Sequence, residues 1–240
     1  MNKPFRFKEF TVQQDKTAMK VGTDGVLLGA WCSVDNYPDS VLDIGSGTGI
    51  ISLMIAQRSD AMTIDAVEVD ENAYEQTVAN FEESDWGDRL YCYNATFQEF
   101  ADEMAEEEET YDLIVSNPPF YTDEFETKNE ARNKARFTSS LSFEELIKGV
   151  AKILSLEGKF EIILPFKEEV DFIGLAKKYN LFLNKVCRVK GSLSSEIKRS
   201  LLSFSFQEST ILEDELIIEI TRHNYTEDYI NLTKDFYLKM

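Results

Sequence analysis

The chain has 240 residues, of which 43% are hydrophobic, and this is enough to fill the core of one large α/β domain. Its formal net charge of −19 opposes general binding to nucleic acid, because phosphate groups repel an acidic surface. A single histidine, His223, excludes multi-histidine metal sites, and three scattered cysteines match neither a zinc site nor a disulfide framework, so we expect no metal.

We expect no targeting signal in the N-terminal segment. Residues 1–10 lack the apolar core of a signal peptide, and no stretch approaches the roughly 18 consecutive apolar residues of a membrane span. We therefore expect a cytoplasmic protein that does not enter a membrane. Residues 5–12, "FRFKEFTV", alternate in polarity as an exposed strand does, and Asp24 is placed to cap a short helix over residues 24–32.

From residue 40 onward, apolar strands alternate with helical segments. Strands are expected at 40–45, 63–70, 89–95, 111–116 and 158–165, and near 181–190, 199–207 and 215–221, with helices at 49–58, 71–84, 97–108, 142–155 and 167–179. This alternation predicts an α/β fold with a mostly parallel sheet and helices on both faces. No linker or repeat divides the chain, so we expect a single domain over residues 1–240, with residues 1–39 as a short N-terminal extension.

The stretch "VLDIGSGTGI" places Gly45, Gly47 and Gly49 between a buried strand and a helix. Glycines allow a tight turn there, and they let a ligand approach the amides at the start of the helix. Glu68 ends the next strand, 19 positions after Gly49, where a carboxylate can accept hydrogen bonds from both hydroxyls of a ribose. A helix cap is the simpler role for such an acid, but the glycine-rich turn favours ribose binding.

Asp43 narrows the choice of ligand. Its negative charge beneath the glycine-rich loop disfavours a phosphate and favours a ligand with a cationic amino acid end. S-adenosyl-L-methionine combines a ribose, an adenine, an ammonium group and a sulfonium without any phosphate. We therefore predict that it is the cofactor.

The stretch "SNPPFY" follows the fourth core strand. The side-chain carbonyl of Asn117 and the backbone carbonyl of Pro118 are two acceptors whose directions the prolines fix, and Phe120 offers a face for stacking a planar base. Two acceptors that converge on a primary amine hold it and direct its lone pair toward an electrophile. The stretch Asn117, Pro118, Pro119 and Phe120 thus predicts a catalytic clamp for a planar amine, although a strand end with a packed aromatic would show the same residues.

Three segments carry local positive charge: residues 1–20, 128–136 and 185–199 have net charges of +3, +3 and +4. Chance scatter can produce such clusters in a chain of this length. Alternatively, the three segments meet on one face and form an anion-binding surface on an otherwise acidic body.

Together, "LDIGSGTG", "VEVD" and "SNPPFY" resemble the class I S-adenosylmethionine-dependent methyltransferases that act on amines. The segments 15–31, "DKTAMKVGTDGVLLGAW", and 224–240, "NYTEDYINLTKDFYLKM", resemble more specifically the bacterial enzymes that methylate the exocyclic adenosine amine beside the anticodon of valine tRNA. The resemblance covers essentially the whole chain. It implies a Rossmann-like fold with a mostly parallel seven-stranded sheet, and an N-terminal extension that packs on the cofactor site.

The resemblance also implies roles for individual residues. The residues expected to bind the cofactor are Gly22, Thr23, Asp43, Gly45, Gly47, Glu68 and Thr96, where Thr96 replaces the acid that the family often uses to contact the adenine amine. The partner is expected to be a tRNA anticodon stem-loop, gripped by the basic segments, and we expect a monomer. The residues expected to bind RNA are Lys16, Tyr121, Arg132, Arg136, Lys198 and Arg199.

Other functions remain compatible with these motifs. The same amine clamp suits methylation of a guanine amine in ribosomal RNA or of a protein glutamine amide. We favour tRNA because those families carry further N-terminal domains, for which residues 1–39 are too short. A cofactor-binding RNA chaperone without catalysis is the alternative outside the enzymes, and an intact clamp disfavours it.

Overall fold

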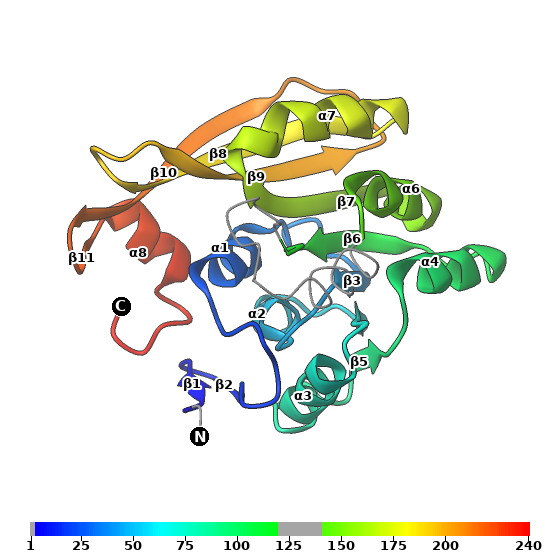
Figure 1. The fold of residues 1–240 in the computed structure, drawn as a ribbon, viewed down its shortest axis with the longest axis horizontal. Coiled ribbons are helices and arrows are strands. Elements are labelled where there is room, and N and C mark those ends of the chain that lie inside the picture. The colour runs from blue at the N-terminus through cyan, green and yellow to red at the C-terminus, as the bar shows by residue number, and fades with distance from the viewer. Residues whose placement is uncertain (1–2, 120–140) are drawn as a thin grey trace, which may run out of the picture.

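The computed structural model of the chain describes residues 3–119 and 141–240, and Figure 1 shows how their helices and strands are arranged. The largest feature of this described part is a nine-stranded sheet. From one edge to the other, its strands are β11 (Asn224–Tyr225), β10 (Leu212–Thr221), β8 (Phe182–Ser192), β9 (Ile197–Ser205), β7 (Leu154–Pro165), β6 (Tyr111–Ser116), β3 (Ser40–Ile44), β4 (Thr63–Val67) and β5 (Leu90–Tyr93).

The sheet is mostly parallel, as predicted. Neighbouring strands from β5 to β7 pair in parallel, whereas β9 runs antiparallel to both β7 and β8. The seven strands from β5 to β8 form the predicted sheet, and within the described residues β10 and β11 extend it to nine. The extension arises because the expected strand at 215–221 joins the same sheet, in parallel with β8.

Helices cover both faces of the sheet, which confirms the predicted α/β class. Their bounds are α1 (Thr23–Trp31), α2 (Ile50–Arg58), α3 (Glu71–Glu82), α4 (Phe97–Glu106), α6 (Phe143–Ile153), α7 (Glu169–Lys178) and α8 (Glu227–Thr233), with a 3₁₀ turn, η2 (Phe166–Glu168), before α7. Side chains of α1, α2 and α8 share one hydrophobic cluster, and those of α4, α6 and α7 share the other.

The beginning of α1 differs from the expectation. The helix has Gly22 at its N-cap, and no side chain caps it, so the prediction that Asp24 is the cap is wrong. The Asp24 carboxylate instead accepts a hydrogen bond from Nε of Arg199, at 2.8 Å. An ion pair across the fold has therefore replaced a local helix cap.

The expected strand at residues 5–12 is also wrong as a continuous element. It is divided into β1 (Phe5–Arg6) and β2 (Thr11–Val12), which pair with each other outside the main sheet. The segment packs against the other end of the chain, because Phe7 forms an isolated bridge with Tyr237 and their rings stack at 5.8 Å between centroids. The aromatic side chains thus bury themselves against the C-terminal residues rather than extending a strand.

Candidate active site

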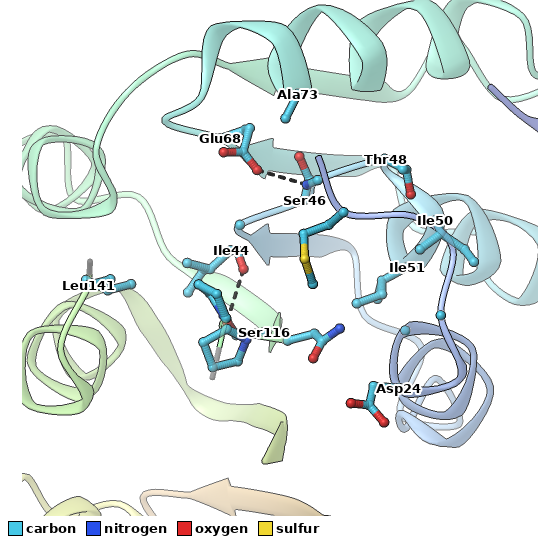
Figure 2. Close-up of a pocket in the computed structure, with 18 of the residues that line it drawn as sticks. Asp24, Ile44, Ser46, Thr48, Ile50, Ile51, Glu68, Ala73, Ser116 and Leu141 are labelled. Carbon is cyan, nitrogen blue, oxygen red and sulfur yellow. Dashed lines mark hydrogen bonds between the residues drawn. The ribbon is translucent and has the colours of Figure 1, made fainter. Parts of the chain in front are cut away.

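A cavity of about 1690 Å³ opens at the carboxyl ends of the strands β3, β4, β6 and β7 (Figure 2). Its walls come from the loops that follow these strands, from the start of α4, and from residues 17–20 and 22–25 of the N-terminal part. Ligands of open α/β sheets gather at the carboxyl ends of the strands, so a binding site is expected here.

The glycine-rich loop presents bare backbone to this cavity. Gly45 and Gly47 have φ values of 76° and 60°, which glycine adopts at little cost. A Cβ atom built on either residue would meet nothing within 4 Å, so the space beside both is open. The loop is fixed from below, since the Gly45 N–H donates to the carbonyl of Val67 at 2.8 Å. A ligand can therefore approach the loop backbone closely without displacing side chains.

Glu68 lies between this loop and the start of α3. One of its carboxylate oxygens accepts a hydrogen bond from the Gly47 N–H at 2.9 Å, and the other accepts one from the Asp70 N–H at 2.9 Å. Figure 2 shows the first of these bonds as a dashed line from the labelled Glu68. The carboxylate lines the cavity in a fixed orientation, as a ribose acceptor must.

Three polar residues of α3 point into the protein, and two of them support the loop. Gln76, Thr77 and Asn80 are all buried, with exposed fractions of 2%, 0% and 1%. The Thr77 hydroxyl donates to the carbonyl of Gly47 at 3.2 Å, and the Asn80 amide donates to that of Thr48 at 2.8 Å. These bonds satisfy carbonyls of the turn, which would be costly to leave buried and unpaired.

The same side of α3 holds the N-terminal segment beside the cavity. Asn80 accepts from the Gln13 N–H at 2.8 Å and donates to the Gln13 carbonyl at 2.9 Å, while Gln76 accepts from the Lys16 N–H at 2.9 Å. One helix thus anchors both the glycine-rich loop and the residues leading to Thr17–Lys20 of the cavity wall. Sequence reasoning missed these roles, because polar residues on a helix ordinarily indicate its solvent side.

Asp43 is not among the residues that line the cavity. Its side chain is fully buried, and its Oδ2 accepts a hydrogen bond from the Ser52 hydroxyl of α2 at 2.8 Å. The other oxygen, Oδ1, has no hydrogen-bond partner within the described part of the chain. Burial raises the pKa of this carboxyl to about 7, although the bonds from Ser52 act in the opposite direction. The side chain of Asp43 therefore lies beneath α2, and its expected contact with a cationic ligand end stays a prediction.

Thr96 does line the cavity, but its hydroxyl also serves as a helix cap. It accepts from the Glu99 N–H at 3.3 Å and donates to the Glu99 carboxylate at 2.6 Å, so that α4 begins with a capping box. The sequence "TFQE" has the Thr-x-x-Glu signature of such a box, which could have revealed this second role.

The expected amine clamp lies where β6 ends. Asn117, Pro118 and Pro119 all line the cavity; Asn117 is half-buried, Pro118 is buried and Pro119 is exposed. The preceding residue ties β6 to β3, because the Ser116 hydroxyl donates to the carbonyl of Ile44 at 3.0 Å, as Figure 2 shows. The fourth clamp residue, Phe120, lies outside the described residues. The structure thus brings the first three clamp residues and the glycine-rich loop into one cavity.

The residues expected to close over the cofactor line the same cavity. Gly22 and Thr23 form part of its wall, where α1 begins. The neighbouring ion pair of Asp24 with Arg199 is partly exposed, with side-chain fractions of 28% and 32%. Lys198 lies in the wall beside this pair.

The expected RNA-binding residues are divided among different places. Lys198 and Arg199 line the cavity. The ammonium group of Lys16 instead pairs with the carboxylate of Glu75 on α3, at 2.8 Å. The hydrogen bond to Glu75 raises the pKa of Lys16. The predicted residues Tyr121, Arg132 and Arg136 lie outside the described residues.

The basic segment 185–199 does not present all its charges to one surface. Arg188 binds Glu169 at 2.7 Å and Glu213 at 2.8 Å, and Lys190 binds Glu215 at 2.7 Å. These cations serve as ion pairs beside β10. Lys198 and Arg199 are the basic residues of this segment that line the cavity.

Comparison with known proteins places the chain in a family. The methyltransferase small domain matches residues 28–170. A protein of Christiangramia forsetii named tRNA1(Val) (adenine(37)-N6)-methyltransferase is 57% identical over 239 residues, covering 100% of this chain and 99% of that protein. A protein of Flavobacterium johnsoniae with the same name is 58% identical over 237 residues, covering 98% and 100%. The chain belongs to this methyltransferase family.

The fold of the methyltransferase family is also found among solved structures. A predicted O-methyltransferase of Agrobacterium tumefaciens has a TM-score of 0.66 to this chain at 17% identity, covering 89% of this chain and 96% of that one. At this low identity the likeness concerns the fold alone. Together with the matched domain, it confirms the predicted class I methyltransferase architecture.

The next features lie outside the cavity of this methyltransferase. His223 is exposed in the turn between β10 and β11, away from the residues that line the cavity. Among residues 3–119 and 141–240, no group of three or more His, Cys, Asp or Glu side chains is arranged to hold a metal ion. The described helices include none with the length and apolar character needed to cross a membrane.

Sequence reasoning missed three further residues of the cavity wall: Lys20, Phe166 and Lys167. Lys20 lies in the N-terminal segment, and the other two follow the end of β7. The position at a strand end on the binding edge is the signal that could have found Phe166 and Lys167, since ligands gather there.

Proposed function

We propose that the protein methylates the exocyclic N6 amine of adenine 37, next to the anticodon of a valine tRNA, with S-adenosyl-L-methionine as methyl donor. The relatives that carry this activity in their names match the chain over its full length. The observation that carries the proposal is the meeting of Asn117–Pro119 with the loop at Gly45–Gly47 in one cavity. The protein is proposed to act as a single domain, as a monomer and in the cytoplasm.

The residues of the cavity fit this cofactor. Open space above Gly45 and Gly47 admits a ligand close to the backbone, and Glu68 offers fixed carboxylate oxygens to a ribose. When bound, S-adenosylmethionine supplies an electrophilic methyl group.

Asn117 and Pro118 provide the acceptors for the amine. The Asn117 side-chain carbonyl and the Pro118 backbone carbonyl are proposed to accept the two N–H groups of N6, which fixes the nitrogen and directs its lone pair. Pro118 is buried, so its carbonyl direction is held by packing as well as by the proline ring. Positioning of this kind provides most of the proposed rate enhancement.

A strong general base is not needed in this proposal. The amine nitrogen becomes cationic as it acquires the methyl group, the electron pair of the broken carbon–sulfur bond leaves with S-adenosylhomocysteine, and the nitrogen then loses a proton to water. The exposed position of His223, remote from the cavity wall, agrees with this scheme. The pH dependence of turnover should therefore lack a histidine step.

Methyl transfer to unmodified valine tRNA tests the proposal directly. Wild-type protein, labelled S-adenosylmethionine and the transcript are incubated, and nucleoside digestion then identifies the product. We expect N6-methyladenosine, no product from a transcript with guanosine at position 37, and loss of turnover in Asn117→Ala with cofactor binding retained. Label in ribosomal RNA or protein but not in tRNA would refute the substrate. Binding of cofactor and RNA without formation of S-adenosylhomocysteine would favour the chaperone alternative.

A further inference from the structure

Phe166 is an exposed aromatic side chain in the wall of the active-site cavity. It is the first residue of η2, directly after β7, and 39% of its surface is exposed. The phenylalanines nearby in the fold behave differently: Phe160, Phe172 and Phe204 are 0% exposed and pack against one another in the core. The chain thus turns at Pro165, which is buried, and leaves one ring facing the cavity.

The cavity is larger than one small ligand requires. Pockets for single small molecules have volumes of about 300 to 1,000 Å³, whereas this one has about 1690 Å³. One part of its wall contains the glycine-rich loop and Glu68, where the cofactor is proposed to bind. A second part contains Asn117–Pro119, Pro165–Lys167 and Glu196–Arg199. The cavity as a whole therefore has room for more than one small ligand.

Two lysines lie near Phe166: Lys167 follows it in the chain, and the strand register places Lys198 across from it. Pro165 of β7 lies opposite Arg199 of β9, so Phe166 and Lys198 extend past this pair at the same end of the two strands. Lys198 is exposed, and Lys167 has 59% of its side chain exposed, with Glu168 at 3.6 Å. An exposed ring and two exposed lysines therefore line the same part of the cavity wall, on a chain whose net charge is −19.

Such a combination suits single-stranded RNA. Bases stack on aromatic side chains whatever their sequence, and lysines bind the phosphates between them. The target adenine must reach the clamp at the end of β6, while Phe166 directly follows the neighbouring strand, β7. With the target held at the clamp, a base stacked on Phe166 is an adjacent nucleotide.

We infer that Phe166 stacks on the base of a nucleotide flanking the methylated adenosine, and that Lys167 and Lys198 bind the phosphates of that nucleotide. The inference rests on the proposed function for the identity of the RNA. Stacking of the neighbour stabilises the opened loop, so that extrusion of the target base costs less. Phe166 is thus an RNA-binding residue of the substrate side of the cavity, separate from the cofactor side.

Binding of a fluorescent anticodon stem-loop RNA, followed by anisotropy in the presence of S-adenosylhomocysteine, tests the inference without turnover. Phe166→Ala should weaken RNA affinity by about 5- to 150-fold, the range found for loss of one stacked base, and Phe166→Trp should retain it. The affinity for S-adenosylhomocysteine should not change in either variant. Tyr37→Ala is the matched control. Tyr37 is an aromatic residue with 87% exposure in the loop before β3, so it lies at the amino ends of the strands, opposite the cavity.

The lysine contacts have their own readout. Lys198→Ala should reduce the slope of log affinity against log salt by about 0.7, as expected for one phosphate of a single strand. Lys178→Ala, at the far end of α7, should leave the slope unchanged. Equal RNA affinity of Phe166→Ala and wild type, or equal weakening by Phe166→Ala and Phe166→Trp, would overturn the inference.

Parallel methyl-transfer assays separate this inference from the proposed function. A wild-type protein that binds the RNA through Phe166 without methylating it would refute the proposed function and uphold the inference. If the wild type methylates tRNA while Phe166→Ala binds the RNA as tightly as the wild type does, the proposed function is upheld and the inference is refuted. Failure of the wild type to bind the RNA at all would overturn both.

Discussion

The buried carboxyl of Asp43 makes the stability of this protein depend on pH in a predictable direction. Its side chain is 0% exposed, and burial raises its pKa from the ordinary 3.8 to about 7. The folded state therefore holds this proton more tightly than the unfolded chain does. The resulting stabilisation is fully present below about pH 4 and is lost as the pH rises toward about 7.

The perturbation that isolates this effect is Asp43→Asn. The amide has the same shape, keeps an oxygen to accept from Ser52, and cannot ionise. Since one pKa unit corresponds to about 1.4 kcal/mol, the wild type should lose about 3 kcal/mol relative to the variant between about pH 5 and about pH 8. The new buried NH₂ group costs about 1 to 3 kcal/mol if it finds no acceptor, but this cost is the same at every pH.

Urea unfolding, followed by the fluorescence of Trp31 and Trp86, measures the difference. Wild type and Asp43→Asn are unfolded at several pH values across this range, and the free energy of unfolding is compared at each value. The difference should shift steadily in favour of the variant as the pH rises. A difference that stays constant with pH would refute the reasoning, because it would mean that Asp43 has the same pKa in the folded and unfolded chain.

Three further substitutions test other contacts of the structure. Asn80→Ala removes three hydrogen bonds of a buried amide and should lower the free energy of unfolding by about 2 to 4 kcal/mol, measured by urea unfolding. Glu68→Gln keeps only one acceptor oxygen and should raise the KM for S-adenosylmethionine by about tenfold with kcat little changed, which methyl-transfer kinetics would show. Arg188→Leu leaves the buried Glu169 carboxylate without its cation and should lower stability by about 3 kcal/mol; the double variant with Glu169→Leu should recover most of this loss, and no recovery would contradict the pairing.

The architecture could be predicted because it follows from periodic patterns. Alternation of apolar strands and helical segments gave the parallel sheet, and parallel strands place their carboxyl ends on one edge. This geometry alone brings Gly45, Glu68 and Asn117 into one cavity, although they are far apart in sequence. The positions of these three residues could therefore be predicted without knowing how the side chains pack.

The direction of an individual side chain was harder to predict. Asp43 directly precedes cavity-lining Ile44, but side chains alternate along a strand, so it lies on the other face of β3, beneath α2. Asp24 met a competing partner, Arg199, that lies 175 positions away in the sequence. Such choices depend on tertiary contacts, which local sequence patterns do not record.

Features that follow no periodic sequence pattern could not be predicted at all. The inward polar face of α3, with Gln76 and Asn80, violates the rule that buried helix faces are apolar. Phe166 is a single aromatic residue, and exposed aromatics of this kind have no signature until the surrounding cavity is known.

The contact of Phe7 with Tyr237 has a consequence for synthesis on the ribosome. The N-terminal segment emerges first, but the partner that covers its rings emerges only after the rest of the sheet has been made. At about 5 to 20 residues per second, Phe5 and Phe7 remain without Tyr237 for roughly 10 to 50 seconds. During that interval they form an apolar cluster that chaperones can recognise. Chains that stall before Tyr237 should therefore be the ones that quality-control proteases remove.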